Sequence, residues 1–229
     1  MHKAVNWATM ASPVKIPAAT VSRLPLYLRG LAAGGLGAGH TVSSDELAEL
    51  AGVNAAKVRK DLSYLGTYGT RGVGYDAEFL RLEIGRALGS ANRWPVIVYG
   101  MGNLGRALAN HTGFTDRGFP VVAAIDNDPD KIGRVIDGVP VSGPDDVAEL
   151  VAKHDIGVAV VSTPGNVAQA ATDALVAAGI KSIMSFAPTV LNVPDDVALR
   201  SVDLATELQI LGFHLHRSSM PEESAEKAG

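Results

Sequence analysis

Three glycines that follow an apolar run are the residues whose types and spacing best suit chemistry. The run Val96–Tyr99 leads directly into Gly100-Met101-Gly102-Asn103-Leu104-Gly105. In this pattern the first glycine allows a tight strand-to-helix turn, the second lets the backbone approach a pyrophosphate, and the third lets the helix pack close to the strand. The N–H groups at the start of that helix, predicted over 103–112, would face the phosphates.

An acidic residue stands where the second half of a dinucleotide site requires one. A second apolar run, Val121–Ile125, ends at Asp126, which lies 21 positions after Gly105. A carboxylate at that strand end accepts hydrogen bonds from the hydroxyls of an adenosine ribose. Asn127 and Asp128 follow without an adjacent arginine, so a 2′-phosphate would meet negative charge. The sequence therefore predicts NAD or NADH rather than NADP as the ligand, with a plain structural turn as the alternative.

The composition is that of a folded protein with one large or two small domains. The chain has 229 residues, of which 47% are hydrophobic, and a net charge of −4. It contains no cysteine, so disulfides, thiolate zinc sites and cysteine redox sensing are excluded, and a redox response would have to come through a ligand. No apolar stretch approaches the roughly 20 residues of a membrane span, and the N-terminus lacks the apolar core of a signal peptide. We therefore expect a cytoplasmic protein.

Changes of pattern along the chain predict two domains. Residues 16–90 combine segments of helical spacing with a glycine-rich segment at 66–75, whereas residues 91–202 alternate strands with helices. A final helix is predicted over 203–218, and we expect the unpatterned residues 1–15 and the polar tail 219–229 to be disordered. The alternation predicts an α/β domain with a Rossmann-like, doubly wound parallel sheet, on which ligands lie outside the carboxyl ends of the strands.

Two further segments fall at predicted strand ends and are therefore candidates for the same site. Thr163-Pro164 follows a strand predicted at 157–162, and Phe186-Ala187-Pro188 follows one predicted at 181–186. His111 comes after the glycine-rich helix and could reach a bound nicotinamide, although such a histidine more often caps a helix or packs near its end.

No motif predicts an enzyme or a metal centre. His214 and His216 are two apart on a predicted helix, so they point to different faces, and no acidic ligand is in register. No Ser-His-Asp order, HExxH motif or paired-acid arrangement stands out.

A helix-turn-helix is predicted inside 16–90. Ser43 is the expected N-cap of its first helix, and Glu46 completes a capping box. After a short glycine-containing turn, Asn54 caps a second helix that runs from Ala55 to about Leu65. The glycine-rich residues 66–75 then suggest the hairpin of a winged helix, closed by a helix from Asp76 to Gly89.

The second helix of this motif carries a cluster of positive charge. Lys57, Arg59 and Lys60 lie on it, and Arg71 lies between glycines of the wing, where it could enter a minor groove. Clustered cations bind phosphates through counterion release, and arginine or lysine can read guanine edges in the major groove. An ordinary solvated helix face is the alternative. We predict double-stranded DNA as a partner, because the second helix is the one that docks in DNA.

Over 16–217 the sequence resembles the Rex family of redox-sensing transcriptional repressors. The resemblance rests on these stretches: Val21-Ser22-Arg23-Leu24-Pro25-Leu26-Tyr27-Leu28-Arg29, Val58-Arg59-Lys60-Asp61-Leu62-Ser63-Tyr64, Gly69-Thr70-Arg71-Gly72-Val73-Gly74-Tyr75, Gly100 to Arg106, Asp126-Asn127-Asp128-Pro129-Asp130-Lys131-Ile132-Gly133 and Phe186-Ala187-Pro188. It implies a homodimer with a winged-helix DNA-binding domain, an NAD(H)-binding sensor domain and a C-terminal helix exchanged between subunits. It also implies operators upstream of respiratory and fermentative genes, from which NADH releases the protein while NAD competes without efficient release.

Motif positions, strand ends and the resemblance to the Rex family together predict the site residues. The cofactor-binding set is Gly100, Met101, Gly102, Asn103, Leu104, Gly105, His111, Asp126, Asn127, Lys131, Thr163, Pro164, Phe186, Ala187 and Pro188. The DNA-binding set is Ser43, Lys57, Arg59, Lys60, Ser63, Tyr64 and Arg71. The resemblance further implies that Arg29 pairs with Asp203 in one of two states.

This chain departs from the family at two positions, and two rival functions stay open. The family commonly has tyrosine where His111 stands, and it can have an aromatic residue at Leu204, so redox discrimination could differ here. The first rival is a small NAD-dependent dehydrogenase, although no separate substrate domain or proton donor is evident. The second is a CoA-binding module, which Asp126 disfavours because it would face the ribose phosphate of CoA.

Overall fold

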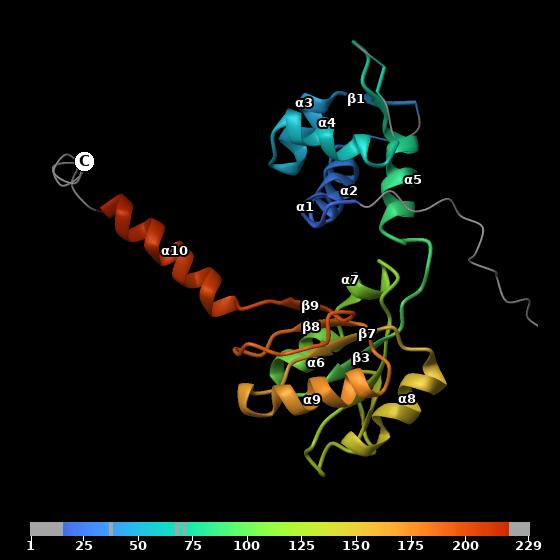
Figure 1. The fold of residues 1–229 in the computed structure, drawn as a ribbon, viewed down its shortest axis with the longest axis vertical. Helices are drawn as coiled ribbons and strands as arrows, with labels where there is room; N and C mark the ends of the chain where they lie inside the picture. The colour runs from blue at the N-terminus through green and yellow to red at the C-terminus, as the bar shows by residue number, and fades with distance from the viewer. Residues whose placement is uncertain (1–15, 37–38, 67–68, 71, 220–229) are drawn as a thin grey trace, which may run out of the picture. The chain divides into compact units, whose positions relative to one another are not determined.

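The computed structural model describes residues 16–36, 39–66, 69–70 and 72–219. The chain divides into two compact units, Met1–Asn92 and Arg93–Gly229. The ends expected to be disordered, 1–15 and 220–229, lie outside the described residues, whereas residue 219 belongs to the last helix. Figure 1 shows both units.

The described part of the first unit consists of short helices and one small sheet. Its elements are α1 (Ala18–Val21), α2 (Leu24–Ala33), β1 (Thr41–Val42), α3 (Ser44–Ala51), α4 (Ala55–Ser63), β2 (Tyr75–Asp76) and α5 (Ala77–Ala87). The strands β1 and β2 pair antiparallel, and Thr70 forms an antiparallel bridge with Gly74. A helix-turn-helix, α3 and α4, followed by a strand pair and a closing helix is the winged-helix fold that the sequence predicts.

Local caps explain why these helices begin where they do. The Ser43 hydroxyl accepts a hydrogen bond from the Glu46 N–H (3.1 Å), and the Glu46 carboxylate accepts one from the Ser43 N–H (2.8 Å), which confirms the capping box. Asn54 caps α4 by accepting from the Lys57 N–H (2.9 Å). The helix α4 ends at Ser63, slightly earlier than predicted. The β1 strand was not predicted, because two residues are too few to produce a periodic signal.

The second unit is organised around a seven-stranded sheet of order β5-β6-β4-β3-β7-β8-β9. The strands are β3 (Val96–Tyr99), β4 (Val121–Ile125), β5 (Val135–Ile136), β6 (Val139–Ser142), β7 (Val158–Val161), β8 (Ser182–Ser185) and β9 (Ala198–Ser201). The edge strand β5 pairs antiparallel with β6, and the other neighbours pair parallel. Without β5, the strands follow the 3-2-1-4-5-6 order of the Rossmann fold, which confirms the predicted fold class.

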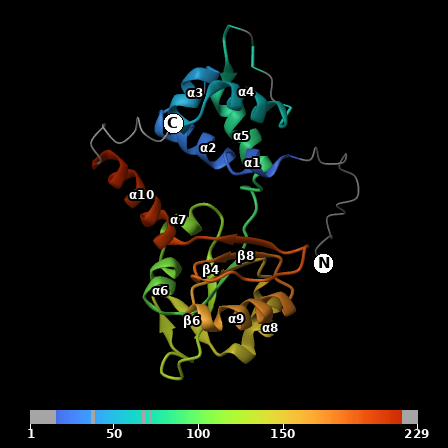
Figure 2. The same ribbon diagram turned by 60° about the vertical axis from the view of Figure 1, so that its left-hand side comes forward.

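Helices cover both faces of this sheet. The helices of this unit are α6 (Asn103–Ala109), α7 (Thr112–Thr115), α8 (Val147–His154), α9 (Gly165–Ala177) and α10 (Leu204–Ser219), with a 3₁₀ turn at Pro144–Asp146. Of these, α10 is exposed along its described length and does not cover the sheet. Alternate residues of β3 point to opposite faces. Ile97 packs in the cluster that holds α8 and α9, whereas Val98 packs in the cluster that reaches Leu108 of α6. Figure 2 shows α8 and α9 on the same side of the sheet.

Two sequence predictions about the second unit were incomplete. The helix predicted over 103–112 ends at Ala109, because the extended backbone of His111 starts the separate short helix α7. The elements β5, β6, α8 and β9 were not predicted. The strands among them are only two to four residues long, which is too short for a clear periodic signal.

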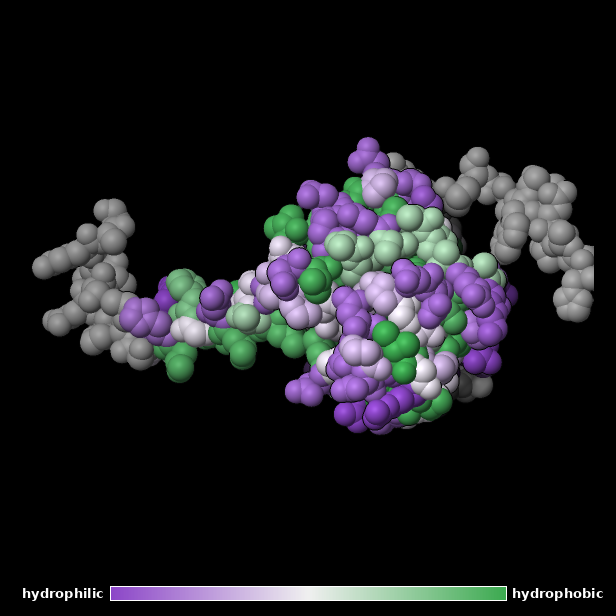
Figure 3. Space-filling view, turned by 90° about the horizontal axis from the view of Figure 1, so that it is seen from below, coloured by the Kyte–Doolittle hydropathy of each residue, from purple (hydrophilic) through white to green (hydrophobic). Residues whose placement is uncertain are grey.

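The last helix leaves an apolar surface exposed within this chain. The Asp203 carboxylate accepts hydrogen bonds from the N–H groups of Ala205 (2.9 Å) and Thr206 (3.2 Å) and so caps α10. The helix exposes apolar side chains along its length, as Figure 3 shows; they are Leu204, Leu208, Ile210, Leu211, Phe213 and Leu215. No helix in the described residues is long and apolar enough to cross a membrane.

Candidate nucleotide and DNA sites

The crevice for a ligand lies where β3 and β7 stand side by side. From β3 the chain continues to β4 on one side, and from β7 it continues to β8 on the other side. Rossmann-like sheets bind their ligands at this switch point. Gly100 follows β3 with a positive φ of 100°, and a Cβ there would lie 2.9 Å from the Ser162 carbonyl oxygen. The Ser162 hydroxyl donates to the Gly100 carbonyl (2.8 Å). The turn after β3 is therefore held against the turn after β7, and only glycine fits there.

The other two glycines of the motif have opposite surroundings. A Cβ on Gly105 would lie 1.8 Å from the Gly100 carbonyl oxygen, so α6 packs against the turn as the pattern requires. A Cβ on Gly102 would meet nothing within 4 Å. Gly102 also precedes the first residue of α6, where free N–H groups attract anions. The structure thus has open space where a pyrophosphate would approach.

Asp126 stands at the end of β4 and faces the glycine turn. Its carboxylate accepts hydrogen bonds from the Met101 N–H (2.7 Å) and the Asp128 N–H (2.9 Å), and Lys131 Nζ lies 3.1 Å away. Burial alone would raise the pKa of Asp126, but these hydrogen bonds outweigh it and hold the pKa below its usual value. The carboxylate is therefore ionised and can accept ribose hydroxyls. Met101 is fully buried and its N–H donates to Asp126, so a contact between Met101 and a ligand stays a prediction.

The Thr163 hydroxyl is a second, independent indication of a ligand site. Its hydroxyl oxygen is buried and has no hydrogen-bond partner, and among the described residues it is alone in this. It follows β7 directly, and its Cγ2 would be 2.9 Å from a Cβ on Gly100. A buried hydroxyl without a partner costs free energy unless a ligand or water satisfies it. Together with the space over Gly102, this arrangement fits a dinucleotide such as NAD(H).

The remaining predicted cofactor residues lie at several places around the sheet. Phe186 follows β8, and its N–H donates to the Val161 carbonyl (2.8 Å), so the Phe186-Ala187-Pro188 segment is fixed beside β7. Asn103 and Leu104 are the first two residues of α6, and Pro164 immediately precedes α9. His111 starts α7 and meets the Phe114 ring edge-on, with 4.9 Å between ring centroids. Its contact with a nicotinamide stays a prediction.

Most of the predicted DNA-binding residues lie on α4 or directly follow it. The cations Lys57, Arg59 and Lys60 are exposed on α4, whereas Val58 and Leu62 of the same helix are buried. Arg59 lines a hollow together with Ser43 at the start of α3 and Thr70 of the wing. The Ser63 hydroxyl donates back to the Lys60 carbonyl (2.7 Å), and Tyr64 is the C-cap of α4. Arg71 lies outside the described residues.

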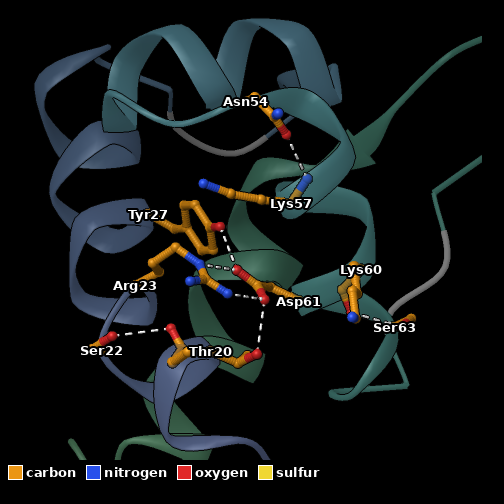
Figure 4. A network of polar contacts seen from close by, with 10 residues as sticks. Thr20, Ser22, Arg23, Tyr27, Asn54, Lys57, Lys60, Asp61 and Ser63 are labelled. Atoms are coloured by element: carbon orange, nitrogen blue, oxygen red, sulfur yellow. Dashed lines mark hydrogen bonds and ion pairs between the residues drawn. The ribbon is translucent and has the colours of Figure 1, made fainter.

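The helix α4 also carries an aspartate, Asp61, whose buried carboxylate forms an ion pair that the sequence did not predict. The Asp61 carboxylate is fully buried and accepts four hydrogen bonds (Figure 4). Arg23 donates two of them (2.6 and 2.7 Å), the Tyr27 hydroxyl one (2.6 Å) and the Thr20 hydroxyl one (2.8 Å). We call these four residues the Asp61 cluster. The charges of Arg23 and Asp61 thus neutralise each other. Arg23 therefore adds no net positive charge to the exposed cations Lys57, Arg59 and Lys60 of α4.

The Asp61 cluster predicts a loss of stability in acid. Burial would raise the pKa of Asp61, but the hydrogen bonds from Arg23, Tyr27 and Thr20 hold it below the usual value. A carboxyl whose pKa is depressed by folding stabilises the protein above its unfolded pKa of about 3.9, and this contribution disappears as the pH falls through the folded pKa. The hydrogen-exchange protection factors of the α2 and α4 amides, which correct for the intrinsic rate at each pH, should therefore fall in that acid range. A D61N variant, already destabilised, should lack this step.

The two residues expected to form a switch belong to different units. Arg29 is exposed on α2, and Asp203 is exposed at the start of α10, where Thr206 holds its carboxylate through the hydroxyl (2.9 Å) and the N–H. These bonds hold the pKa of Asp203 below its usual value, so it is available as an anion. The pairing of Arg29 with Asp203 stays a prediction. Among the described residues, no three potential ligands come together as a metal site.

The first unit is a winged helix whose second, recognition-type helix, α4, carries exposed cations. The second is a Rossmann unit with open space at its glycine turn. Together they define the class of ligand-responsive DNA-binding regulators. Residues 15–63 match the family described as "Putative DNA-binding protein N-terminus", and residues 91–189 match the family described as "CoA binding domain". The redox-sensing transcriptional repressor Rex of Streptomyces avermitilis is 54% identical over 213 residues, which are 93% of this chain and 84% of the relative. The chain belongs to the Rex family of redox-sensing transcriptional repressors.

Solved structures agree with this assignment. The crystal structure of RSP in complex with beta-NAD+ and operator DNA is 34% identical and has a TM-score of 0.84, covering 96% of this chain and all of that one. RSP in complex with beta-NADH is also 34% identical, with a TM-score of 0.80, covering 94% of this chain and 99% of that one. The relatives named as repressors support a regulator in preference to an enzyme.

Proposed function

We propose that this chain is a transcriptional repressor whose affinity for operator DNA depends on the ratio of NADH to NAD+. The observation that carries the proposal is the end of the sheet after β3 and β7, where Gly102 borders open space and the buried Thr163 hydroxyl has no hydrogen-bond partner. RSP, a Rex-family repressor, was crystallised with operator DNA and beta-NAD+ and separately with beta-NADH. We infer that the chain acts in the cytoplasm on respiratory and fermentative genes and is not an enzyme.

The residues present define how each part of the cofactor would be held. The N–H groups at the start of α6 would bind the pyrophosphate, and Asp126 would accept the adenosine ribose hydroxyls. Asn127 and Lys131 lie on the same turn as Asp126. The nicotinamide ring is positively charged in NAD+ and neutral in NADH. Thr163, Phe186 and Pro188 would form a partly apolar site that favours the neutral ring.

The exposed apolar side of α10 supports a homodimer with an exchanged helix. Leu208, Leu211 and Leu215 are more than 60% exposed within one chain, and a helix with so much exposed apolar surface gains stability by packing against a partner. In the proposed mechanism, NADH favours a closed dimer whose two α4 helices no longer match half-sites separated by whole turns of DNA. Differential affinity for the two states of about 3 kcal/mol would shift the equilibrium roughly 150-fold.

The decisive experiment titrates NADH against DNA binding. The chain selects its own operator from a random pool of duplexes, and fluorescence anisotropy then follows release by NADH at a fixed NAD+ concentration. We expect NADH to release the duplex at concentrations where the same increment of NAD+ does not. Equal release by both nucleotides, or by neither, would reject the redox-sensor proposal.

Two other ligand classes are tested by the same protein. Thermal shifts with NADH, NAD+, NADPH and CoA compare the proposal with a CoA-binding module, because a ligand that binds the native state raises the melting temperature. Incubation of NADH with candidate carbonyl substrates tests for a dehydrogenase, for which turnover is expected. A larger shift with CoA than with NADH, or measurable turnover, would favour the rival function.

Replacing Asp126 with alanine should weaken NADH binding and reduce discrimination against NADPH. The variant loses an acceptor for the ribose hydroxyls and the charge that repels a 2′-phosphate. Loss of a hydrogen bond to a charged group costs about 1.5–3 kcal/mol, or roughly a tenfold to hundredfold change in Kd. Calorimetric titration with both nucleotides measures this. D128A is the matched control, because it removes a second carboxylate beside Lys131 (3.5 Å) and should have a smaller effect.

A further inference from the structure

The Asp61 cluster joins segments that are distant in the sequence through one buried carboxylate. Thr20 lies in α1, Arg23 immediately precedes α2, and Tyr27 lies in α2, whereas Asp61 lies in α4. Both carboxylate oxygens receive two hydrogen bonds, so the group is fully satisfied although none of its surface is exposed. A buried network of this kind fixes one relative position of its helices, because any sliding would leave a charge unpaired.

The position of Asp61 on α4 makes this anchor relevant to DNA binding. Asp61 directly follows Lys60 and precedes Ser63 by two residues, while Lys57, Arg59 and Lys60 are exposed on the same helix. Apolar contacts alone tolerate small rotations of a helix, whereas a bidentate arginine and a phenol directed at one carboxylate do not. The angle at which the cationic side chains of α4 face outward is therefore set by the cluster.

The helix α2, which contributes Tyr27 to the Asp61 cluster, also carries the predicted switch residue Arg29. Tyr27 is buried on α2, and Arg29, two residues later, is exposed on a different side of that helix. A displacement of Arg29 would therefore move α2, which is hydrogen-bonded to α4 through Tyr27 and Asp61. Figure 4 shows the connection between the two helices, in which the Tyr27 hydroxyl of α2 donates to the Asp61 carboxylate of α4.

We infer that the Asp61 cluster makes α2 and α4 move as one body, so that Thr20, Arg23 and Tyr27 are positioning residues for DNA recognition and transmit the cofactor signal to α4. This inference rests on the proposed function. A cluster that served only to stabilise the fold would lower the melting temperature when weakened, but it would leave the DNA affinity and NADH response of the folded protein unchanged.

The test uses Tyr27→Phe and Thr20→Val in the full chain. Each removes one hydroxyl that donates to Asp61 and keeps the shape of the side chain. I84V is the matched control, since Ile84 of α5 is fully buried in the same core and, as an apolar side chain, donates no hydrogen bond to Asp61. Anisotropy is measured well below the melting temperature of each variant, with the operator, with a random duplex, and with NADH added.

We expect Y27F to bind the operator about tenfold more weakly while its affinity for the random duplex stays the same. We also expect the ratio of operator affinities without and with NADH to fall severalfold, and I84V to match the unchanged chain in both readouts. If Y27F fails to fold, T20V, which leaves Arg23 and Tyr27 on the carboxylate, gives the same readouts. Variants that melt earlier yet keep both the operator affinity and the NADH ratio would overturn the inference. If the unchanged chain itself shows no NADH-dependent release, the proposed function fails, and the inference fails with it.

Discussion

Gly102→Ala should give a folded protein that binds operator DNA and no longer responds to NADH. The backbone at Gly102 has a φ of −74°, which alanine adopts without strain, and its Cβ would meet no protein atom within 4 Å. The added methyl group would instead occupy the space through which a pyrophosphate approaches the start of α6. The substitution therefore acts on the ligand and not on the fold.

The expected size of this effect follows from the contacts that the methyl group blocks. Several backbone N–H groups at the start of α6 would lose their phosphate partners, and each charge-assisted hydrogen bond is worth about 1.5–3 kcal/mol. We expect NADH binding to weaken at least 100-fold, because each 1.4 kcal/mol corresponds to a factor of ten. Calorimetry measures the binding, and anisotropy measures the release of operator.

Two other glycines serve as controls. A Cβ on Gly85 in α5 would come no closer than 3.9 Å to the Ser90 side chain, so G85A should behave as the unchanged chain. A Cβ on Gly105 would lie 1.8 Å from the Gly100 carbonyl oxygen, so G105A should destabilise the unit as well as abolish binding. If G102A released the operator at the same NADH concentration as the unchanged chain, the glycine turn would not be the pyrophosphate site.

Local signals made much of this architecture predictable from the sequence. The capping box at Ser43 and Glu46 and the cap at Asn54 involve neighbours three residues apart, so they can be recognised without a structure. The glycine turn and Asp126 are also local to the ends of two apolar runs. The parallel sheet followed from the alternation of strands with helices. The resemblance to the Rex family supplied the exchange of α10 and the switch pair, which a single chain does not test.

The features that were missed depend on distant pairings. Arg23 and Asp61 are 38 residues apart, and no sequence pattern predicts that they pair. No periodicity indicates that an aspartate on a cationic helix points inward to an arginine and a tyrosine. Likewise, β1 exists because its two residues pair with β2, at Thr41 with Asp76. The unsatisfied hydroxyl of Thr163 depends on the packing of β7 against the glycine turn and has no sequence signal.

Arg59→Ala should weaken binding to the operator by about tenfold to 100-fold and weaken binding to random duplex far less. Arg59 is exposed on α4 and lines a hollow with Ser43 and Thr70, so its guanidinium is placed between the helix-turn-helix and the wing. An arginine that contacts a guanine edge is worth about 1–3 kcal/mol of discrimination, which corresponds to this range. Anisotropy with both duplexes at several salt concentrations separates base reading from phosphate binding.

The salt dependence distinguishes the roles of neighbouring cations on α4. A residue that binds only phosphate weakens binding to all sequences about equally and reduces the slope of log K against log salt by about one. We expect this behaviour for K57A and K60A, and no effect for R86A, because Arg86 is an exposed arginine of the same unit that pairs with Glu83 on α5. If R59A also weakened both duplexes equally, Arg59 would bind phosphate, and base reading would belong to another residue. If R59A changed neither affinity, the cationic face of α4 would not be the DNA-binding surface, because Arg59 is the cation of α4 that lines the hollow between α3 and the wing.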